Sequence, residues 1–251
     1  RAGCDDILIT FPIVGQLMEP GREFHPPVAS VLAQAIYDES DVAFLVRWND
    51  MSAETTGANS PALVVPREEE EAQEGAASGA AAATDEWGEA KPAAAADPWG
   101  EAEAPAAGAA SAGAFSDAVA IQLPLQLPTG ARKPYFLFGD PVNGVDLWFA
   151  DLARGSADQF AARGSSAITA LDASDVTSTA HYDKGEWSVI FKRSLTAASG
   201  VPFSPGSFVP IAFSVWDGGS RERGNKRGLT LWSSLYVEPQ TVVSATGPAI
   251  K

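Results

Sequence analysis

Alternating apolar and polar residues are the clearest pattern in the C-terminal half of this 251-residue chain. In segment 186–195 apolar side chains occupy every second position, which predicts a β-strand with one buried face. The residues expected to face the core are Trp187, Val189 and Phe191, and those expected to face away are Ser188, Ile190 and Lys192. The sequence YDKGEW, residues 182–187, is typical of a hairpin turn leading into this strand.

Five further segments are rich in β-branched and aromatic residues and are bounded by Gly, Pro, Asn or Asp, so they predict strands. They are residues 41–48, 117–125, 134–139, 208–216 and 229–238. One short window, SADQFAARG at 156–164, predicts a helix because it starts with a serine cap and ends with glycine. Together these elements predict an all-β fold, a single antiparallel β-sandwich with few short helices.

Residues 67–113 differ in composition from the rest of the chain. Ala, Gly, Pro and acidic residues dominate there, with eleven Asp or Glu against two Lys or Arg, a net charge of −9. Such a segment buries too little apolar surface to offset its ordering entropy. We therefore expect a disordered, low-complexity acidic insertion in one domain formed by residues 1–66 and 114–251. The motif DEWGEA recurs in it as DPWGEA, either as a docking element or as repeat drift.

Composition excludes several classes of function. A net charge of −15 leaves no dense basic surface for nucleic acid. A single cysteine, Cys4, excludes a disulfide framework and any Cys-rich zinc or iron–sulfur site in this chain. No apolar run approaches the roughly 20 residues that span a bilayer. The chain begins without an initiator Met, which favours a processed chain whose targeting peptide has been removed.

Catalytic motifs are missing as well. The chain contains no G-x-S-x-G, H-E-x-x-H, P-loop or G-x-G-x-x-G sequence, and His25 and His181 stand apart from any carboxylate motif. The sequence therefore favours a protein without acid–base chemistry of its own. A carbohydrate-binding β-sandwich with exposed Trp or Tyr platforms is one alternative.

The densest group of cations lies in WDGGSRERGNKRGLTLW, residues 216–232. It contains Arg221, Arg223, Lys226 and Arg227 between two predicted strands. Taken by itself, this pattern predicts a basic hairpin tip that is solvated or is attracted to the acidic insertion.

Three segments in this order resemble the haem b-binding gamma subunit of type II dimethyl sulfoxide reductase-family molybdoenzymes. They are residues 117–152, 182–195 and 210–238, and the resemblance extends over about 41–50 and 115–238. This family includes dimethyl sulfide dehydrogenase, ethylbenzene dehydrogenase, selenate reductase and chlorate reductase. The resemblance implies a non-catalytic β-sandwich subunit with one non-covalent b-type haem. The subunit would relay electrons in the periplasm between an iron–sulfur beta subunit and a carrier such as a c-type cytochrome. The beta subunit would in turn be the partner of a molybdenum-containing alpha subunit.

The resemblance also implies residue roles. Lys226 matches the family's axial lysine, which must bind iron as the neutral amine. Arg221, Arg223 and Arg227 would pair with haem propionates or an acidic partner. The aromatic residues Trp216, Trp232 and Phe213 would either line the porphyrin or belong to the core.

The second axial ligand departs from the family pattern, because Phe138 stands where the relatives have Met. We expect Met51 to replace it, on the hypothesis that 41–51 runs antiparallel to 117–125 and that 117–125 runs antiparallel to 134–139. The alternatives are Met18, His25 or a single protein ligand.

Overall fold

Thirteen β-strands and no helix are found in the part of the chain that the computed structural model describes, residues 8–18, 21–23, 26–64, 114–172, 174–197 and 199–239. In chain order they are β1 (Ile9–Met18), β2 (Gly21–Glu23), β3 (Ser30–Tyr37), β4 (Asp41–Asn49), β5 (Ala118–Pro124), β6 (Val145–Asp151), β7 (Ser156–Ala162), β8 (Ile168–Ala170), β9 (Thr177–Asp183), β10 (Glu186–Ser194), β11 (Phe208–Trp216), β12 (Arg227–Thr230) and β13 (Ser233–Tyr236). The all-β class is confirmed. The predicted insertion lies outside the described residues, so its boundaries remain a prediction. None of the described segments forms a helix of the length and apolarity needed to cross a membrane.

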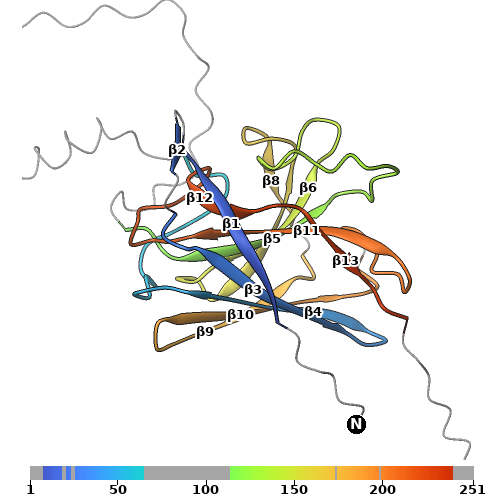
Figure 1. Cartoon of the computed structure of the whole chain (residues 1–251), viewed down its shortest axis with the longest axis horizontal. Coiled ribbons are helices and arrows are strands. Elements are labelled where there is room, and N and C mark those ends of the chain that lie inside the picture. Colours follow the sequence, from blue (N-terminus) through green and yellow to red (C-terminus); the bar gives the residue numbers. More distant parts are fainter. Residues whose placement is uncertain are drawn as a thin grey trace, which may run out of the picture.

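The strands form two layers that β1 connects. Their hydrogen-bonded order is β8-β7-β6-β5-β11-β12-β1-β3-β4-β10-β9, with β13 beside β11 and β2 beside β1. The first part of β1 pairs with β3 and the later part pairs with β12. Figure 1 shows β1 crossing from the layer of β3 and β4 to that of β11 and β12. All named pairs are antiparallel, as the predicted sandwich requires.

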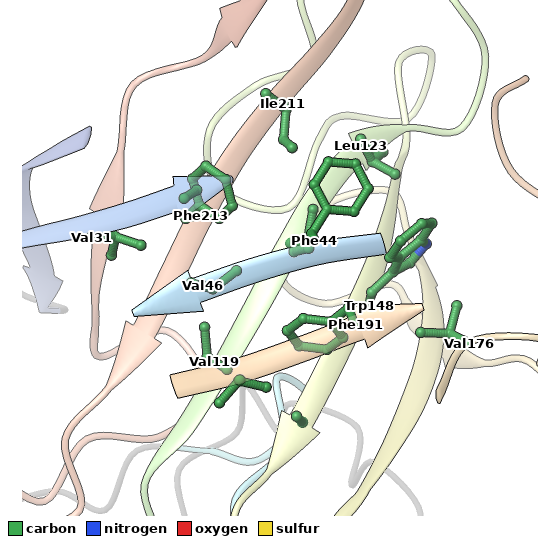
Figure 2. Close-up of a cluster of buried hydrophobic side chains, with 14 of the residues drawn as sticks. Val31, Phe44, Val46, Val119, Leu123, Trp148, Val176, Phe191, Ile211 and Phe213 are labelled. Carbon is green, nitrogen blue, oxygen red and sulfur yellow. The ribbon is translucent and has the colours of Figure 1, made fainter. Parts of the chain in front are cut away.

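The main hydrophobic core lies between the two layers. Strands β4 and β10 contribute Phe44, Val46 and Phe191, and the facing layer contributes Val119, Leu123, Trp148 and Phe213. Figure 2 shows these side chains meeting between the strands. In β10 the predicted alternation is confirmed, because Trp187, Val189 and Phe191 are buried whereas Ile190 and Lys192 are exposed.

The hairpin predicted at 182–187 is confirmed. Glu186 pairs with Asp183, so the turn between β9 and β10 consists of Lys184 and Gly185. Their φ angles of 50° and 81° match a primed two-residue turn, whose twist suits the flanking strands.

The helix predicted at 156–164 is wrong, because residues 156–162 form strand β7. This strand pairs with β6 along its whole length, and its two faces contact different clusters. Ala157 packs against the main core, whereas Phe160 and Ala162 belong to a second apolar cluster. Pairing with a neighbouring strand thus overrides the helical preference of an alanine-rich segment.

The strand predicted at 134–139 is also wrong. Gly139 N donates to Tyr135 O at 2.8 Å, and Phe138 and Gly139 have φ angles of 59° and 78°, so this segment is a turn. The place beside β5 is taken by β6. The strand predicted at 229–238 is confirmed only in part, because Leu231 and Trp232 separate β12 from β13.

The pairing used to choose Met51 as a ligand is wrong too. Strand β4 pairs with β3 and β10, and β5 pairs with β11 and β6, so β4 and β5 lie in different layers. The route from 41–51 through 117–125 to 134–139 therefore does not exist in this fold. Met51 has to be considered from its own surroundings.

Candidate functional site

The loop of residues 217–226, which contains Lys226, joins β11 to β12 and is folded by its own backbone. Arg221 N donates to Gly218 O at 3.0 Å, and Lys226 N donates to Arg223 O at 3.0 Å. At the base of the loop, Trp216 Nε1 donates to Gly224 O at 3.0 Å. These bonds give the predicted basic hairpin tip a defined shape.

Residues 50–64 support this loop from one side. The buried side chain of Asn59 donates to Glu222 O and to Ser116 O, each at 2.9 Å, and so connects the loop to the start of β5. Arg223 Nε donates to Val64 O at 2.9 Å. Three chain segments distant in sequence therefore meet at the loop.

Gly224 is the point of closest approach between the loop and residues 61–64. Its φ is +58°, and a Cβ atom placed there would lie 1.9 Å from Leu63 O. Any side chain would force the two segments apart and would also strain the backbone.

Replacement of Gly224 by Ala is therefore expected to lower the free energy of unfolding by about 1–3 kcal/mol. Urea unfolding monitored by tryptophan fluorescence measures the effect. Gly130→Ala is the matched control, because nothing lies within 4 Å of a Cβ atom at that position. Equal stability of the two variants would contradict the close approach.

Asp117 fixes the base of the loop from below. It is fully buried, and its carboxylate accepts hydrogen bonds from Gly218 N, Glu54 N and Trp187 Nε1 at 2.8, 2.8 and 3.0 Å. Burial is the main cause that raises the pKa of Asp117 to about 7, and the charge of Asp50 adds to it, although these hydrogen bonds act against the shift. Sequence analysis missed Asp117, because its partners come from three separate segments.

The cations of the loop lie in different surroundings. Lys226 is half-buried, and its Nζ donates to Ser220 O at 2.8 Å within the loop. The guanidinium carbons of Arg221 and Arg223 lie 5.5 and 4.7 Å from the ring centroid of Phe115. These two arginines therefore lie on the side of the loop that faces the start of β5.

Arg227 is fully buried on the other side of the loop. Its Cζ lies 3.6 Å from the ring centroid of Phe138, Nε donates to Ser214 Oγ at 3.1 Å, and Nη2 donates to Phe136 O at 3.3 Å. Its Nη1 has no hydrogen-bond partner, and among the described residues no carboxylate forms an ion pair with it. Burial without a counter-ion lowers the pKa of Arg227 to about 9, so the side chain is still a cation at neutral pH.

The surroundings of Arg227 are a second apolar cluster, on the face of β5, β6, β7 and β11 that points away from the main core. Its members are Ala118, Ala120, Phe138, Val145, Leu147, Phe149, Phe160, Ala162 and Trp216, with Trp232 packed against them. Two buried polar atoms close to this side of the fold, Trp232 Nε1 and Gln122 Oε1, make no hydrogen bond. Buried apolar side chains thus lie close to unpartnered donors and an unpartnered acceptor.

The structure brings some of the predicted site residues together and separates others. Phe138 and Trp216 both lie near the guanidinium of Arg227, directly after Lys226 in sequence. Phe213 does not share this cluster, because it belongs to the main core and packs against Phe11 with the two rings tilted by 55°. Met51 is 99% exposed, in the segment that follows β4.

The role of Met51 as an iron ligand remains a prediction. The same holds for Met18, which is described only by its backbone, and for His25, which lies outside the described residues.

Comparison with known proteins shows a sequence family that part of this chain resembles. Residues 152–228 match the model of the ethylbenzene dehydrogenase family. A protein of Haloferax mediterranei named as a respiratory nitrate reductase heme subunit is 32% identical over 120 residues, which is 47% of this chain and 42% of that relative. The chain thus spans less than half the length of this relative.

A solved carbohydrate-binding module of family 9 from Caldicellulosiruptor kristjanssonii, in complex with glucose, aligns with a TM-score of 0.43 at 10% identity and covers 96% of this chain and 92% of that module. The family match, by contrast, includes the whole loop of residues 217–226 and Arg227. The resemblance indicated by the sequence motifs is confirmed, because residues 152–228 are similar to the ethylbenzene dehydrogenase family and the chain is similar to a protein named as a heme subunit.

Proposed function

We propose that this protein is the haem b subunit of a molybdenum oxidoreductase complex and transfers electrons without substrate chemistry of its own. The observation that carries the proposal is the buried cation Arg227, which has no carboxylate partner among the described residues and lies against the second apolar cluster. A buried charge is retained at this cost when it has a bound counter-ion. A haem b molecule offers both an apolar ring and carboxylates.

The chemistry of the residues fits such a group. The second apolar cluster is dry and rich in aromatic side chains, a composition that suits the faces of a porphyrin. Arg227 Nη1 and Trp232 Nε1 are buried donors that lack partners, and they would hold the propionate end. Arg221 and Arg223 lie on the Phe115 side of the loop and are proposed to face a partner subunit.

Lys226 would hold the haem iron through its amine nitrogen. The side chain is half-buried and its Nζ has one protein acceptor, Ser220 O. Ligation requires loss of the proton, because only the neutral amine has a lone pair to donate. When bound, the haem would supply one-electron redox chemistry. Met51 remains our proposed second ligand, with Met18 and His25 as alternatives.

The remaining parts of the complex are proposed from the family. The molybdenum alpha subunit and the iron–sulfur beta subunit would be separate chains, and a c-type cytochrome or a similar carrier would exchange electrons with this subunit in the periplasm. The single cysteine supports this division, because this chain cannot ligate an iron–sulfur cluster with four of its own thiolates. The family match to residues 152–228 supports the same assignment.

Haem titration of the purified full-length chain tests the proposal. Arg227→Gln removes the charge and keeps a polar side chain, so haem affinity is expected to fall roughly 10–100-fold, the value of one or two charge-assisted hydrogen bonds. The control is Arg132→Gln, which removes an exposed arginine. A native chain that acquires no Soret band, or equal haem affinity in the two variants, would contradict the proposal.

Carbohydrate binding is the weaker alternative. This function would require exposed aromatic platforms. Among the described tryptophans, Trp232 is half-buried and the others are buried, namely Trp48, Trp148, Trp187 and Trp216. Among the described tyrosines, Tyr135 and Tyr236 are exposed, each beside a phenylalanine. A colourless protein that binds glucose would favour this alternative.

A further inference from the structure

Four acidic residues meet at the base of the loop of residues 217–226. Asp50 follows β4, Glu54 lies in the next turn, Asp117 precedes β5 and Asp217 follows β11. One carboxylate oxygen from each lies within 4.8 Å of the other three. The fold therefore brings together four negative groups from three distant segments.

No positive side chain in the described part of the chain forms an ion pair with this group. Within the described residues, every ion pair involves other carboxylates, and none of the four has a Lys, Arg or His partner. Asp117 is fully buried and Asp50 is 9% exposed, so solvent screens these charges poorly. A compensating charge is needed, and the residues that the structure describes do not provide one here.

Two oxygens of the group have no hydrogen bond although they are buried. They are Asp50 Oδ2 and Glu54 Oε2. Burial raises the pKa of Asp50 to about 6. The nearby NH group of Trp48 acts against this increase, although it makes no hydrogen bond. The other oxygens are oriented by donors, as when Ser220 N and Oγ bind Asp217 at 3.0 and 3.1 Å. Free, buried and oriented oxygens are what a cation site offers before it is filled.

We propose that Asp50, Glu54, Asp117 and Asp217 bind one calcium ion. All the donors are hard oxygens, which excludes a preference for soft metals. An ion about 2.3–2.6 Å from each oxygen can span the group, since opposite ligands of calcium are then about 4.6–5.2 Å apart. Magnesium at about 2.0–2.1 Å would require a tighter group and would retain more of its water.

The ion would connect the segment after β4 and the start of β5 to the end of β11. It would therefore stabilise the base of the loop that contains Lys226. This assignment does not depend on haem, because none of the four residues belongs to the second apolar cluster around Arg227. Failure of either proposal leaves the other intact.

Terbium luminescence and thermal unfolding of the chelator-treated full-length chain test the site. Trp187 Nε1 donates to Asp117 at 3.0 Å, so excitation of tryptophan should sensitise a bound terbium ion, and calcium should displace it. Calcium at about 100 times its Kd should raise Tm by roughly 5–10 °C, and magnesium at the same concentration should raise it less. Haem absorbance is recorded separately, so loss of one ligand is not mistaken for loss of the other.

Variants locate the ion. Asp50→Asn and Glu54→Gln each remove one charge and should abolish both the sensitised emission and the Tm shift. The control is Glu39→Gln, an exposed residue just before the start of β4, which should leave both unchanged. If Asp50→Asn does not fold, the emission and the Tm shift of Glu54→Gln alone test the proposed site. Absence of emission and of any Tm shift up to about 10 mM calcium, or equal responses of native and variant chains, would overturn the proposal.

Discussion

Replacement of Lys226 by Ala is expected to abolish the low-spin haem spectrum of the protein. The family resemblance implies that this amine ligates the iron, and the side chain is half-buried in a loop with a defined backbone. Alanine cannot reach or ligate iron, so the reduced-minus-oxidised spectrum should become that of high-spin or haem-free protein. Absorbance and haem content after gel filtration measure the change.

The control for this variant is Lys184→Asn. Lys184 is 89% exposed at the tip of the β9–β10 hairpin, and asparagine tolerates its positive φ of 50°. Its spectrum should be unchanged. A native spectrum in Lys226→Ala would reject the ligand assignment, even if haem binding by the second apolar cluster were retained.

Replacement of Arg193 by Met is expected to lower the free energy of unfolding by about 3–5 kcal/mol. Arg193 is 2% exposed, and its Nη1 lies 3.9 Å from Oδ2 of fully buried Asp146. The guanidinium also donates to Ser199 O and Val201 O, and it lies 5.0 Å from the ring centroid of Trp148. Methionine keeps the packing on the Trp148 ring. It removes the cation beside Asp146 and the donor to the carbonyls of Ser199 and Val201.

The matched control is Arg154→Met. Its ion pair with Asp158 is exposed, so the cost should stay under about 1 kcal/mol. Equal costs in the two variants would contradict a buried pair. Combining Arg193→Met with Asp146→Asn should recover part of the loss, which a double-mutant cycle measures.

The loss in Arg193→Met should also depend on pH. Burial already raises the pKa of Asp146, and removal of the nearby cation raises it further. A carboxyl group with a higher pKa in the folded state binds its proton more tightly there, so stability increases as pH falls through that pKa. The variant should therefore be less impaired at about pH 5 than at about pH 8.

Strands with one exposed face were the predictable part of the fold. In β10 the alternation of buried and exposed residues is complete enough to read from sequence, and Lys184 with Gly185 specifies the turn before it. By contrast, β5 and β6 are buried on both faces, because the second apolar cluster covers the side away from the main core. Alternation is lost in such strands, and β6 was not predicted.

Short apolar or alanine-rich segments misled the analysis for a related reason. Residues 156–162 carry no strong period, and only pairing with β6 decides that they form a strand. Residues 134–139 are rich in aromatics, yet the positive φ of Phe138 turns the chain and buries the ring beneath Arg227. Local propensity does not contain this information, because the energy comes from contacts with distant residues.

Sequence by itself determined the all-β class, the hairpin before β10, and the cationic loop with Lys226, since each depends on neighbouring residues and on local turn chemistry. Only the tertiary structure decided that Arg227 is buried with no carboxylate partner among the described residues, and that the carboxylates of Asp50, Glu54, Asp117 and Asp217 lie close together. The physical reason is that burial and charge proximity are properties of chain segments brought together by folding. Residues far apart in sequence acquire them only when the two layers close.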